Sequence, residues 1–375
     1  MSAGAEQEVA RARELVLRHG WNATAFQIVN PGITHWFSRA GDAVVGYVTW
    51  ARVRVVAGAP VCPGERLADV VREFEAEAAA AGEGVCYFGS AGRVHEYLLS
   101  HPGYSAVVLG AQPVWDPADW AAITDGHASL RAQLNRARNK GVSVAEWPVE
   151  RAEGNPLLRA CLSDWLAHRG LPPLHFLVEP ETLASLAGRR VFVAERADGP
   201  VAGFTVLSPI PARDGWLTEQ FPRASDAPNG TVELLLDAAV RAVARDGARY
   251  VTLGLVPLAA HNWNPRDYNP LWLSAVMAWV RAHGRRFYDF AGLDAFKSKF
   301  RPQEWEPIFA VANEPRFSPR TLWAIAGAFG GRSPLSLVSR AMARAVGQEG
   351  RWLLEGKRSS GRRRYGANAA TIMPK

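Results

Sequence analysis

The hydrophobic pattern of the chain alternates between short β-rich runs and amphipathic stretches. Runs rich in Val, Tyr and Phe that end at turn residues are typical of strands, and apolar residues three and four positions apart are typical of helices. In the first part of the chain the pattern predicts helices at 6–19, 64–81 and 129–140 and strands at 43–49, 52–56, 85–88 and 106–109. From about residue 155 the order returns, with helices at 156–168, 231–245 and 271–283 and strands at 191–195, 201–208, 216–219, 249–253 and 308–312.

This alternation predicts a mixed α/β fold with two lobes of similar build. We expect an N-terminal lobe at 1–150 and a C-terminal lobe, which carries the active site, at 151–325. A basic amphipathic helix and a disordered tail are expected at 326–375. The length of 375 residues is sufficient for two hydrophobic cores.

The positive charge of the chain is concentrated at its C-terminal end. The sequence has 43 Lys and Arg against 36 Asp and Glu, a formal net charge of +7. Residues 351–375 hold seven bases and one acid, so this segment accounts for most of that charge. The remainder is close to neutral, which excludes a uniformly basic protein.

The cysteines exclude two common structural roles. Cys62, Cys86 and Cys161 are odd in number and far apart in the sequence. They therefore do not form a disulfide scaffold or a paired zinc-ligand motif, and they suit a reducing compartment. We expect no metal site.

Charged residues also interrupt the apolar segments that targeting or membrane insertion would need. Glu6 and Glu8 lie where a signal peptide requires an apolar run, and Arg52 and Arg54 break the most apolar stretch of the chain. We expect a cytoplasmic protein, with peripheral attachment to the inner face of the plasma membrane as an alternative.

The helix expected at 129–140 contains several bases and no acid. Arg131, Asn135 and Arg138 share one face of it, and Arg136 lies on the same helix. Arginine forks bind phosphate oxygens in pairs, so the stripe suits a nucleic-acid backbone. The alternative is an ordinary solvated helix face.

The segment between the strand at 216–219 and the helix at 231–245 is the next candidate. Glu219 and Arg223 lie where the strand opens into the loop, a frequent place for active groups on α/β scaffolds. Asn229 lies in a strong turn sequence and Glu233 in the first turn of the helix. A well-formed loop with no catalytic function is the alternative.

Two further segments combine polar and aromatic residues. The long run at 252–270, which contains His261, has little periodicity, and a loop of this length is usually functional. At 284–306, Lys297 and Lys299 alternate with aromatic residues, which suits either a nucleotide or acyl-chain clamp or a core with solvated lysines.

The C-terminal region predicts contact with a charged surface. A helix at 335–346 places apolar residues on one face and Arg340 and Arg344 on the other, and the polybasic tail follows. This combination suits anionic lipid or tRNA. The alternative is a packed last helix with a disordered tail.

Several of these segments together resemble the C-terminal catalytic domain of phosphatidylglycerol lysyltransferases, the aminoacyl-phosphatidylglycerol synthases. The resemblance covers roughly residues 20–325. It rests on four stretches in the same order, SLRAQLNRARNKG at 129–141, DAPNG at 226–230, LGLVPL at 253–258 and FYDFAGLDAFKSKFRPQEWEP at 287–307, and on the opening stretch WFSRAGDAVVGYVTWARVRVVAGAPVCP at 36–63.

The resemblance implies a fold of two tandem acetyltransferase-like (GNAT) lobes, each a mixed sheet flanked by helices. It also implies an aminoacyltransferase that uses aminoacyl-tRNA as co-substrate, without another cofactor, and moves the amino acid to a hydroxyl of a membrane lipid such as phosphatidylglycerol. A sterol or small metabolite is the alternative acceptor. The chain departs from the family in having no membrane-spanning helices, and Pro222 stands where the family pattern has an arginine.

The resemblance also implies roles for the candidate residues. Glu219 and Arg223 are the expected catalytic residues, Glu219 as the base or amine anchor and Arg223 as the group that binds the acceptor or a phosphate of the tRNA 3′ end. The other expected substrate contacts are Lys297 and Lys299 with phosphate, Arg131, Arg136 and Arg138 with the tRNA acceptor arm, and Asn229, Glu233 and His261 around the site.

Two other classes of function stay open. An acyl-CoA N-acyltransferase would need a glycine-rich turn before a helix to hold pyrophosphate, and the spacing at 88–93 does not fit that motif. A non-catalytic module that binds tRNA or membrane is the second alternative.

Overall fold

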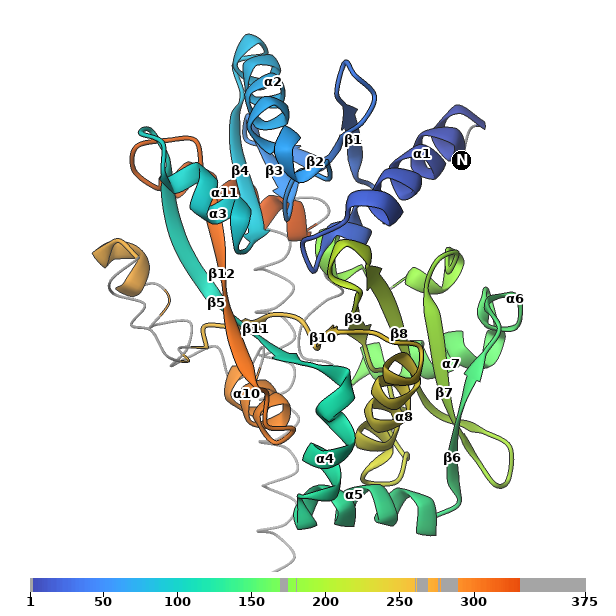
Figure 1. Cartoon of the computed structure of the whole chain (residues 1–375). Coiled ribbons are helices and arrows are strands. Elements are labelled where there is room, and N and C mark those ends of the chain that lie inside the picture. Colours follow the sequence, from blue (N-terminus) through green and yellow to red (C-terminus); the bar gives the residue numbers. More distant parts are fainter. Residues whose placement is uncertain are drawn as a thin grey trace, which may run out of the picture.

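Twelve strands form one continuous mixed sheet in the computed structural model, which describes residues 3–168, 175–179, 181–259, 261, 269–275, 277 and 289–330. Across the sheet the strands follow the order β1 (Thr34–Phe37), β2 (Val44–Trp50), β3 (Val53–Ala57), β4 (Gly84–Ser90), β12 (Glu304–Ala312), β5 (Ser105–Trp115), β10 (Tyr250–Thr252), β9 (Gly215–Gln220), β8 (Val201–Ile210), β7 (Arg190–Arg196) and β6 (Val142–Trp147). The short β11 (Val256–Pro257) pairs with β5. Figure 1 shows the two halves of the sheet meeting at β5, β10 and β12.

Each half of the sheet contains the same unit. In the first half β1, β2 and β3 are antiparallel, and helix α2 (Leu67–Ala80) connects β3 to the parallel strand β4. In the second half β7, β8 and β9 are antiparallel, and helix α8 (Thr231–Arg245) connects β9 to the parallel strand β10. Two parallel strands that follow each other in the chain need a crossover connection, and a helix provides it in both halves. The two halves therefore share one architecture, as the repeated order of elements predicts.

The chain passes between the halves more than once. β12 comes last among the strands, yet it lies between β4 and β5 of the first half. β6 ends before the division predicted near residue 150, yet it pairs with β7 at the far edge of the second half. The domain bounds at 1–150 and 151–325 stay predictions. At β12 and β6, however, the strand order in the sheet differs from the order in the chain.

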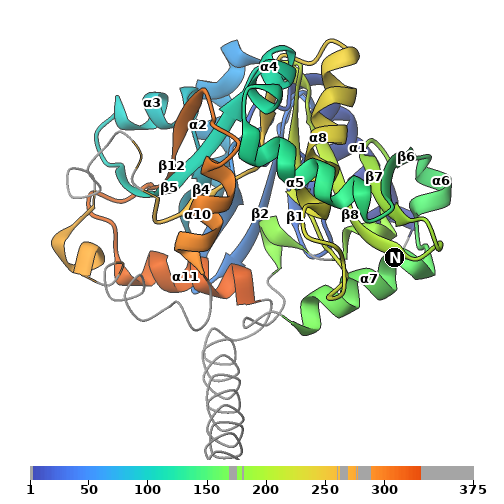
Figure 2. The same ribbon diagram turned by 90° about the horizontal axis from the view of Figure 1, so that it is seen from below.

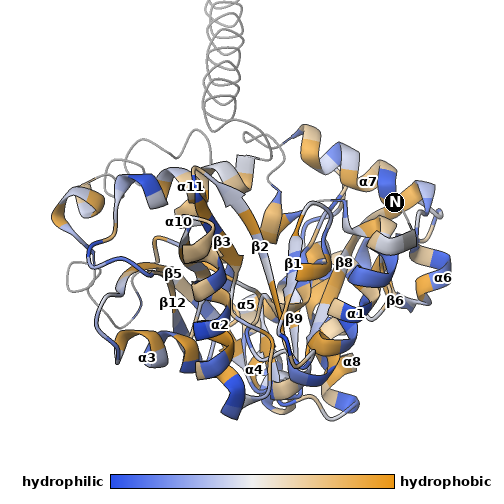
Figure 3. Ribbon diagram, turned by 90° about the horizontal axis from the view of Figure 1, so that it is seen from above, coloured by the Kyte–Doolittle hydropathy of each residue, from blue (hydrophilic) through white to orange (hydrophobic). Residues whose placement is uncertain are grey.

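Helices cover both faces of the sheet (Figure 2). In the first half, α1 (Ala3–His19) and α11 (Pro319–Gly330) share one apolar core with the sheet, and α2 and α3 (Arg93–Leu99) share another on the opposite face. In the second half, α4 (Trp120–Asp125), α5 (Ala128–Asn139) and α8 cover one face, and α6 (Val149–Ala152) and α7 (Pro156–Ala167) cover the other. Figure 3 shows the resulting pattern, with mostly hydrophobic strands inside and mixed turns on the outer helices.

Helix α8 shows how the sequence builds these layers. Its apolar positions Leu235, Leu236, Ala239, Val240 and Val243 are fully buried against the sheet and α5. The helix begins after Gly230, whose φ of +96° is a left-handed conformation that favours glycine. It ends before Gly247, also at positive φ.

The predicted mixed α/β fold is confirmed, and the predicted helix at 231–245 has the observed bounds. The pattern missed β1, β6, β11, α3, α4, α6, α10 (Phe290–Ser298) and α11, because most of these elements are short or contain few regularly spaced apolar residues. The helix expected at 271–283 is described only in part, and the helix at 335–346 and the tail at 351–375 lie outside the described residues. No helix in the described part is long and apolar enough to cross a membrane.

Candidate functional site

A pocket of about 300 Å³ lies at the N-terminal end of α8. Three segments that are distant in the sequence enclose it: α5, the loop between β9 and α8 with the first turn of α8, and α10. The lining residues are Gln133 and Arg136 of α5, Arg223, Asn229 and Gly230 of the loop, Thr231, Val232 and Glu233 of α8, and Phe296 of α10. In Figure 1, α5 crosses below α8, in agreement with this lining.

The loop from 221 to 230 is held by contacts with β8 and β7. After β9 ends, the backbone stays attached to β8, since Phe204 N–H donates to the Pro222 carbonyl and Ala224 N–H to the Ala202 carbonyl. Farther along, the Asp226 carboxylate forms an ion pair of 2.5 Å with Arg196 at the end of β7. The loop therefore presents Arg223 and Asn229 to the pocket from a fixed frame.

The pocket has a predominantly positive lining. Arg136 and Arg223 both line it, and the single lining carboxylate, Glu233, accepts a hydrogen bond of 2.5 Å from Lys299. The Lys299 ammonium also lies 4.0 Å from the centroid of the Phe296 ring. The N-cap residue of α8 is Gly230, which has no side chain to cap the helix, so backbone N–H groups and the helix dipole at this end favour an anion. The arrangement suits a phosphate or another anionic group.

Lys297 of α10 lies in a different environment from Lys299. Its side chain is 3% exposed, and its Nζ donates to the carbonyls of Leu253, Gly254 and Leu255 at 2.6, 2.9 and 3.2 Å. Burial lowers the pKa of this amine to about 7. Lys297 is predicted from the sequence to contact phosphate. In the structure its hydrogen bonds attach α10 to residues 253–255, which follow β10.

Glu219 lies outside the pocket lining. It is the extra residue of a β-bulge, because Val206 of β8 pairs with Gln220 while Leu207 pairs with Thr218. Its Oε1 accepts hydrogen bonds from Arg189 at 2.7 Å and from the Ser208 hydroxyl.

The arginine that pairs with Glu219 is itself enclosed. Arg189 also donates to the Ser185 carbonyl at 2.8 Å and to Asn30 Oδ1 at 2.9 Å. Its guanidinium lies 4.9 Å from the centroid of the Phe26 ring. Arg189 thus joins Glu219 to the 3₁₀ helix η1 (Ala25–Val29), and the Glu219 carboxylate belongs to a buried network between the two halves.

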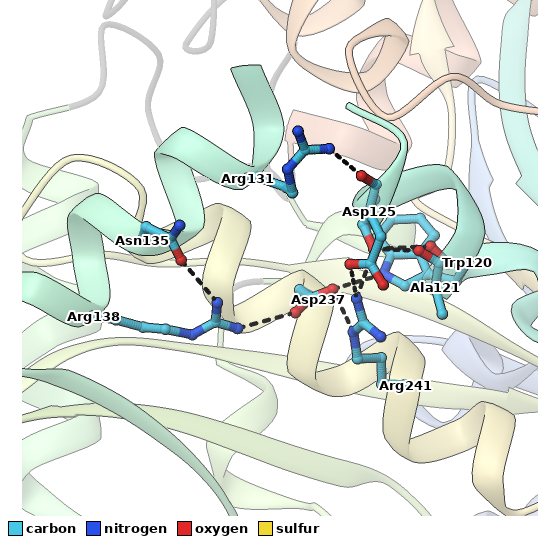
Figure 4. Close-up of polar contacts among 9 residues, drawn as sticks. Trp120, Ala121, Asp125, Arg131, Asn135, Arg138, Asp237 and Arg241 are labelled. Atoms are coloured by element: carbon cyan, nitrogen blue, oxygen red, sulfur yellow. Dashed lines mark hydrogen bonds and ion pairs between the residues drawn. The ribbon is translucent and has the colours of Figure 1, made fainter. Parts of the chain in front are cut away.

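The bases of α5 are exposed, and two of them contact neighbouring helices (Figure 4). Arg131 donates to the backbone carbonyl of Asp125. Arg138 lies 3.5 Å from the buried carboxylate of Asp237, which also binds Arg241 at 2.8 Å. The predicted stripe exists, but Arg136 alone among the three arginines lines the pocket.

His261 is placed by contacts with α10 and β12. Its Nε2 lies 2.8 Å from Asp294 Oδ1, and its ring stacks on Trp305 with centroids 3.8 Å apart. It does not line the α8 pocket.

The structure thus brings together Arg136, Arg223, Asn229 and Glu233, with Lys299 bound to Glu233. The sequence did not point to Gln133 of the lining, or to Arg189 and Ser208 around Glu219, whereas Phe296 is one of the aromatic residues of the clamp considered at 284–306. Ser208 and Arg189 lie 11 and 30 residues before Glu219, so helix or strand periodicity could not have linked them to it. Within the described residues, no group of three or more His, Cys, Asp or Glu is placed to hold a metal ion.

The comparisons with known proteins converge on one family. A family model described as "Phosphatidylglycerol lysyltransferase, C-terminal" matches residues 13–312. The phosphatidylglycerol lysyltransferase of Bacillus subtilis (strain 168) is 24% identical over 293 residues, which are 77% of this chain and 33% of the relative. The chain therefore spans about a third of the length of this curated relative.

Two solved structures show the same fold. A C-terminal domain from Agrobacterium fabrum, described as part of a lysylphosphatidylglycerol synthetase, matches with a TM-score of 0.72 and 23% identity over 87% of this chain and 98% of its own. The structure of L-PGS from Bacillus licheniformis matches with a TM-score of 0.69 and 19% identity over 89% of this chain and 95% of its own.

Proposed function

Because the chain belongs to the phosphatidylglycerol lysyltransferase C-terminal family, we propose that it is an aminoacyltransferase that acts on a membrane lipid. The proposed donor is aminoacyl-tRNA, and the proposed acceptor is a lipid hydroxyl, with phosphatidylglycerol as the first candidate. Neither a metal nor another cofactor is part of the proposal.

The proposed reaction exchanges one ester for another. The lipid hydroxyl oxygen attacks the carbonyl carbon of the aminoacyl ester, and the bond from that carbon to the terminal ribose oxygen of the tRNA breaks. The proton of the lipid hydroxyl is transferred to the departing ribose oxygen. Since the ester is already activated, the enzyme needs to position both substrates, move this proton and stabilise the developing oxyanion.

The observation that carries the proposal is the positive pocket at the N-terminus of α8. Both proposed substrates contain phosphate, and Arg223, Arg136 and the uncapped helix end provide donors for its oxygens. In this proposal Arg223 binds the phosphate of the lipid head group or of the tRNA 3′ end. Glu233 and Asn229 shape the pocket, and Lys299 is held in place by Glu233.

Glu219 is proposed as the base or as the anchor of the substrate amine. Its two described contacts, with Arg189 and Ser208, both use Oε1. Oε2 is therefore the oxygen proposed to face a substrate. The exposed arginines of α5 are proposed to contact the acceptor arm of tRNA.

The proposed location is the cytoplasm, with peripheral contact at the inner face of the plasma membrane. Support comes from the excess of bases at 351–375 and from the exposed apolar side chains of Leu271, Trp272 and Trp323. The aromatic and aliphatic side chains suit a lipid interface, and the bases suit its anionic head groups.

A transfer assay tests the proposal. Purified protein is incubated with a pool of tRNA charged with radiolabelled amino acids and with total lipid extract, and label is measured in the organic phase. Lipid labelling supports the proposal, and tRNA charged with single amino acids then identifies the donor. Deacylation that depends on a soluble extract, without lipid labelling, indicates a small-molecule acceptor. If the tRNA stays fully charged in both conditions, the transferase proposal is wrong.

A further inference from the structure

A second pocket, of about 540 Å³, lies in the first half of the molecule and shares no residue with the pocket at α8. It is formed between α2, α3 and the start of β5, on the face of the sheet that these helices cover. The lining consists of Ala68, Val71, Arg72, Glu75, Ala76 and Ala79 of α2, Tyr97 of α3, His101 and Tyr104 of the following loop, and Asn313 after β12.

Glu75 is the carboxylate of this pocket, and hydroxyl donors hold it in position. Its Oε1 accepts a hydrogen bond of 2.9 Å from Tyr87, and its Oε2 accepts one of 2.7 Å from Tyr104. Tyr87 is fully buried, and the Asn313 side chain provides a further hydrogen bond. Each oxygen keeps capacity to accept another donor from the pocket side.

No cation compensates the charge of Glu75 among the described residues. Arg72, the arginine of the lining, pairs with Asp69, and its side chain is 75% exposed. Burial raises the pKa of Glu75, although the hydrogen bonds from Tyr104, Tyr87 and Asn313 act in the opposite direction. Glu75 is half-buried, and no described Lys, Arg or His forms an ion pair with it, so the open volume beside its carboxylate has room for a positively charged group.

We propose that this pocket binds a small organic cation, a primary ammonium group on a short aliphatic chain, with the nitrogen against the Glu75 carboxylate. An ammonium has three donors and matches the free acceptor positions of Glu75. The rings of Tyr97 and Tyr104 add aromatic surface near the charge, which favours a cation. Val71, Ala76 and Ala79 supply a wall for the aliphatic chain, and the volume suits a small ligand.

This inference does not rest on the proposed transferase activity, because the residues of the two pockets are separate. It also does not depend on tRNA or lipid, so a binding experiment with the full chain alone is sufficient.

The test compares three probes of equal length: hexylammonium, hexanol and hexanoate. Binding is measured at pH 7.5 by calorimetry and by amide chemical shifts. We expect saturable binding of hexylammonium, with affinity at least about tenfold higher than that of hexanol, because only the ammonium donates charge-assisted hydrogen bonds to the carboxylate. Comparable affinity for hexanol, or no saturable binding of hexylammonium at millimolar concentration, would overturn the proposal.

Two variants locate the site. Glu75→Gln retains the size of the side chain and removes the charge, so hexylammonium should bind at least about tenfold more weakly while hexanol is unaffected. Ala76→Trp fills the pocket from an exposed position of α2 and should abolish binding without touching the carboxylate. If Glu75→Gln does not fold, Ala76→Trp decides, and unchanged hexylammonium binding in this folded variant shows that the pocket is not the site.

Discussion

The Arg189 guanidinium and the Glu219 carboxylate form an ion pair of 2.7 Å between side chains that are 1% and 8% exposed. The pair connects β9 to the segment before β7, and Arg189 extends it to Asn30 of the first half. Any chemistry at Glu219 therefore takes place on a carboxylate whose orientation is fixed by a cation from another part of the chain. A substitution of Glu219 is therefore expected to change both the transfer rate and the free energy of unfolding, so both have to be measured for each variant.

Glu219→Gln should reduce the rate of aminoacyl transfer by about 100-fold or more, because a positioned base contributes on that scale. It should also lower the free energy of unfolding by about 3–5 kcal/mol, because Arg189 keeps its buried charge without a partner. Transfer rates are compared at a temperature where denaturation curves show both proteins folded. Ser208→Ala is the control, since it removes a hydrogen bond to Oε1 and leaves the carboxylate. A folded Glu219→Gln protein with full activity would remove the proposed role.

Arg223→Ala should raise the KM for the phosphate-containing substrate by about tenfold and change kcat little, because Arg223 lines the positive pocket without being proposed to take part in bond making. The measurement is steady-state transfer at varied lipid and at varied charged tRNA, which also shows which substrate occupies the pocket. Arg245→Ala, an exposed arginine at the opposite end of α8, is the matched control. Equal effects of the two substitutions would argue against a phosphate site at Arg223.

Lys297 should make stability depend on pH above neutrality. Its pKa is lowered to about 7 in the folded protein, whereas in the unfolded chain it returns to the ordinary lysine value of 10.5. Between these values the unfolded state binds more protons, so the free energy of unfolding rises with pH. Relative to Lys297→Met, the wild type should gain roughly 2 kcal/mol between pH 7 and pH 9. Urea unfolding at several pH values measures this difference, and parallel curves for the two proteins would contradict it.

Deletion of residues 331–375 should weaken binding to vesicles that contain phosphatidylglycerol and leave binding to phosphatidylcholine vesicles unchanged. Each base near an anionic surface contributes about 1 kcal/mol, and this segment holds most of the excess positive charge of the chain. Vesicle sedimentation at low and high salt measures the effect. A full-length variant with the bases of 351–375 changed to Gln separates charge from length. If it sediments as the wild type does, the tail does not bind the membrane through its charge.

Gly230→Ala should destabilise the protein by about 1–3 kcal/mol and alter the α8 pocket. Gly230 has a φ of +96°, and a Cβ there would lie 2.1 Å from the Gln133 carbonyl oxygen of α5. Gly199→Ala is the control, since Gly199 has a φ of +98° with nothing within 4 Å of the added carbon. Thermal unfolding of both variants separates the steric contact from the backbone strain. Equal losses would show that contact with α5 is unimportant.

The local sequence pattern predicts an element correctly where its apolar spacing is regular and glycines mark both of its ends. Helix α8 is the clearest case. It was also sufficient to identify four residues of the pocket, because Arg223, Asn229 and Glu233 are neighbours in sequence and Arg136 lies in an acid-free helix. The burial of Lys297 could not be predicted, because its aromatic neighbours suit a clamp and a core equally well. Its environment is set by the carbonyls of 253–255, which only the tertiary fold brings to it.

The position of β12 has a consequence for how the protein is made. The gap between β4 and β5 stays open until residues 304–312 have left the ribosome, although both neighbouring strands are translated far earlier. The first half therefore cannot complete its sheet before β12 emerges, and until then the facing edges of β4 and β5 stay unpaired, because their partner lies about 200 residues downstream. Nascent chains that stop before β12 should be sensitive to proteases and dependent on chaperones, and release of the last strand should be the event that closes the fold.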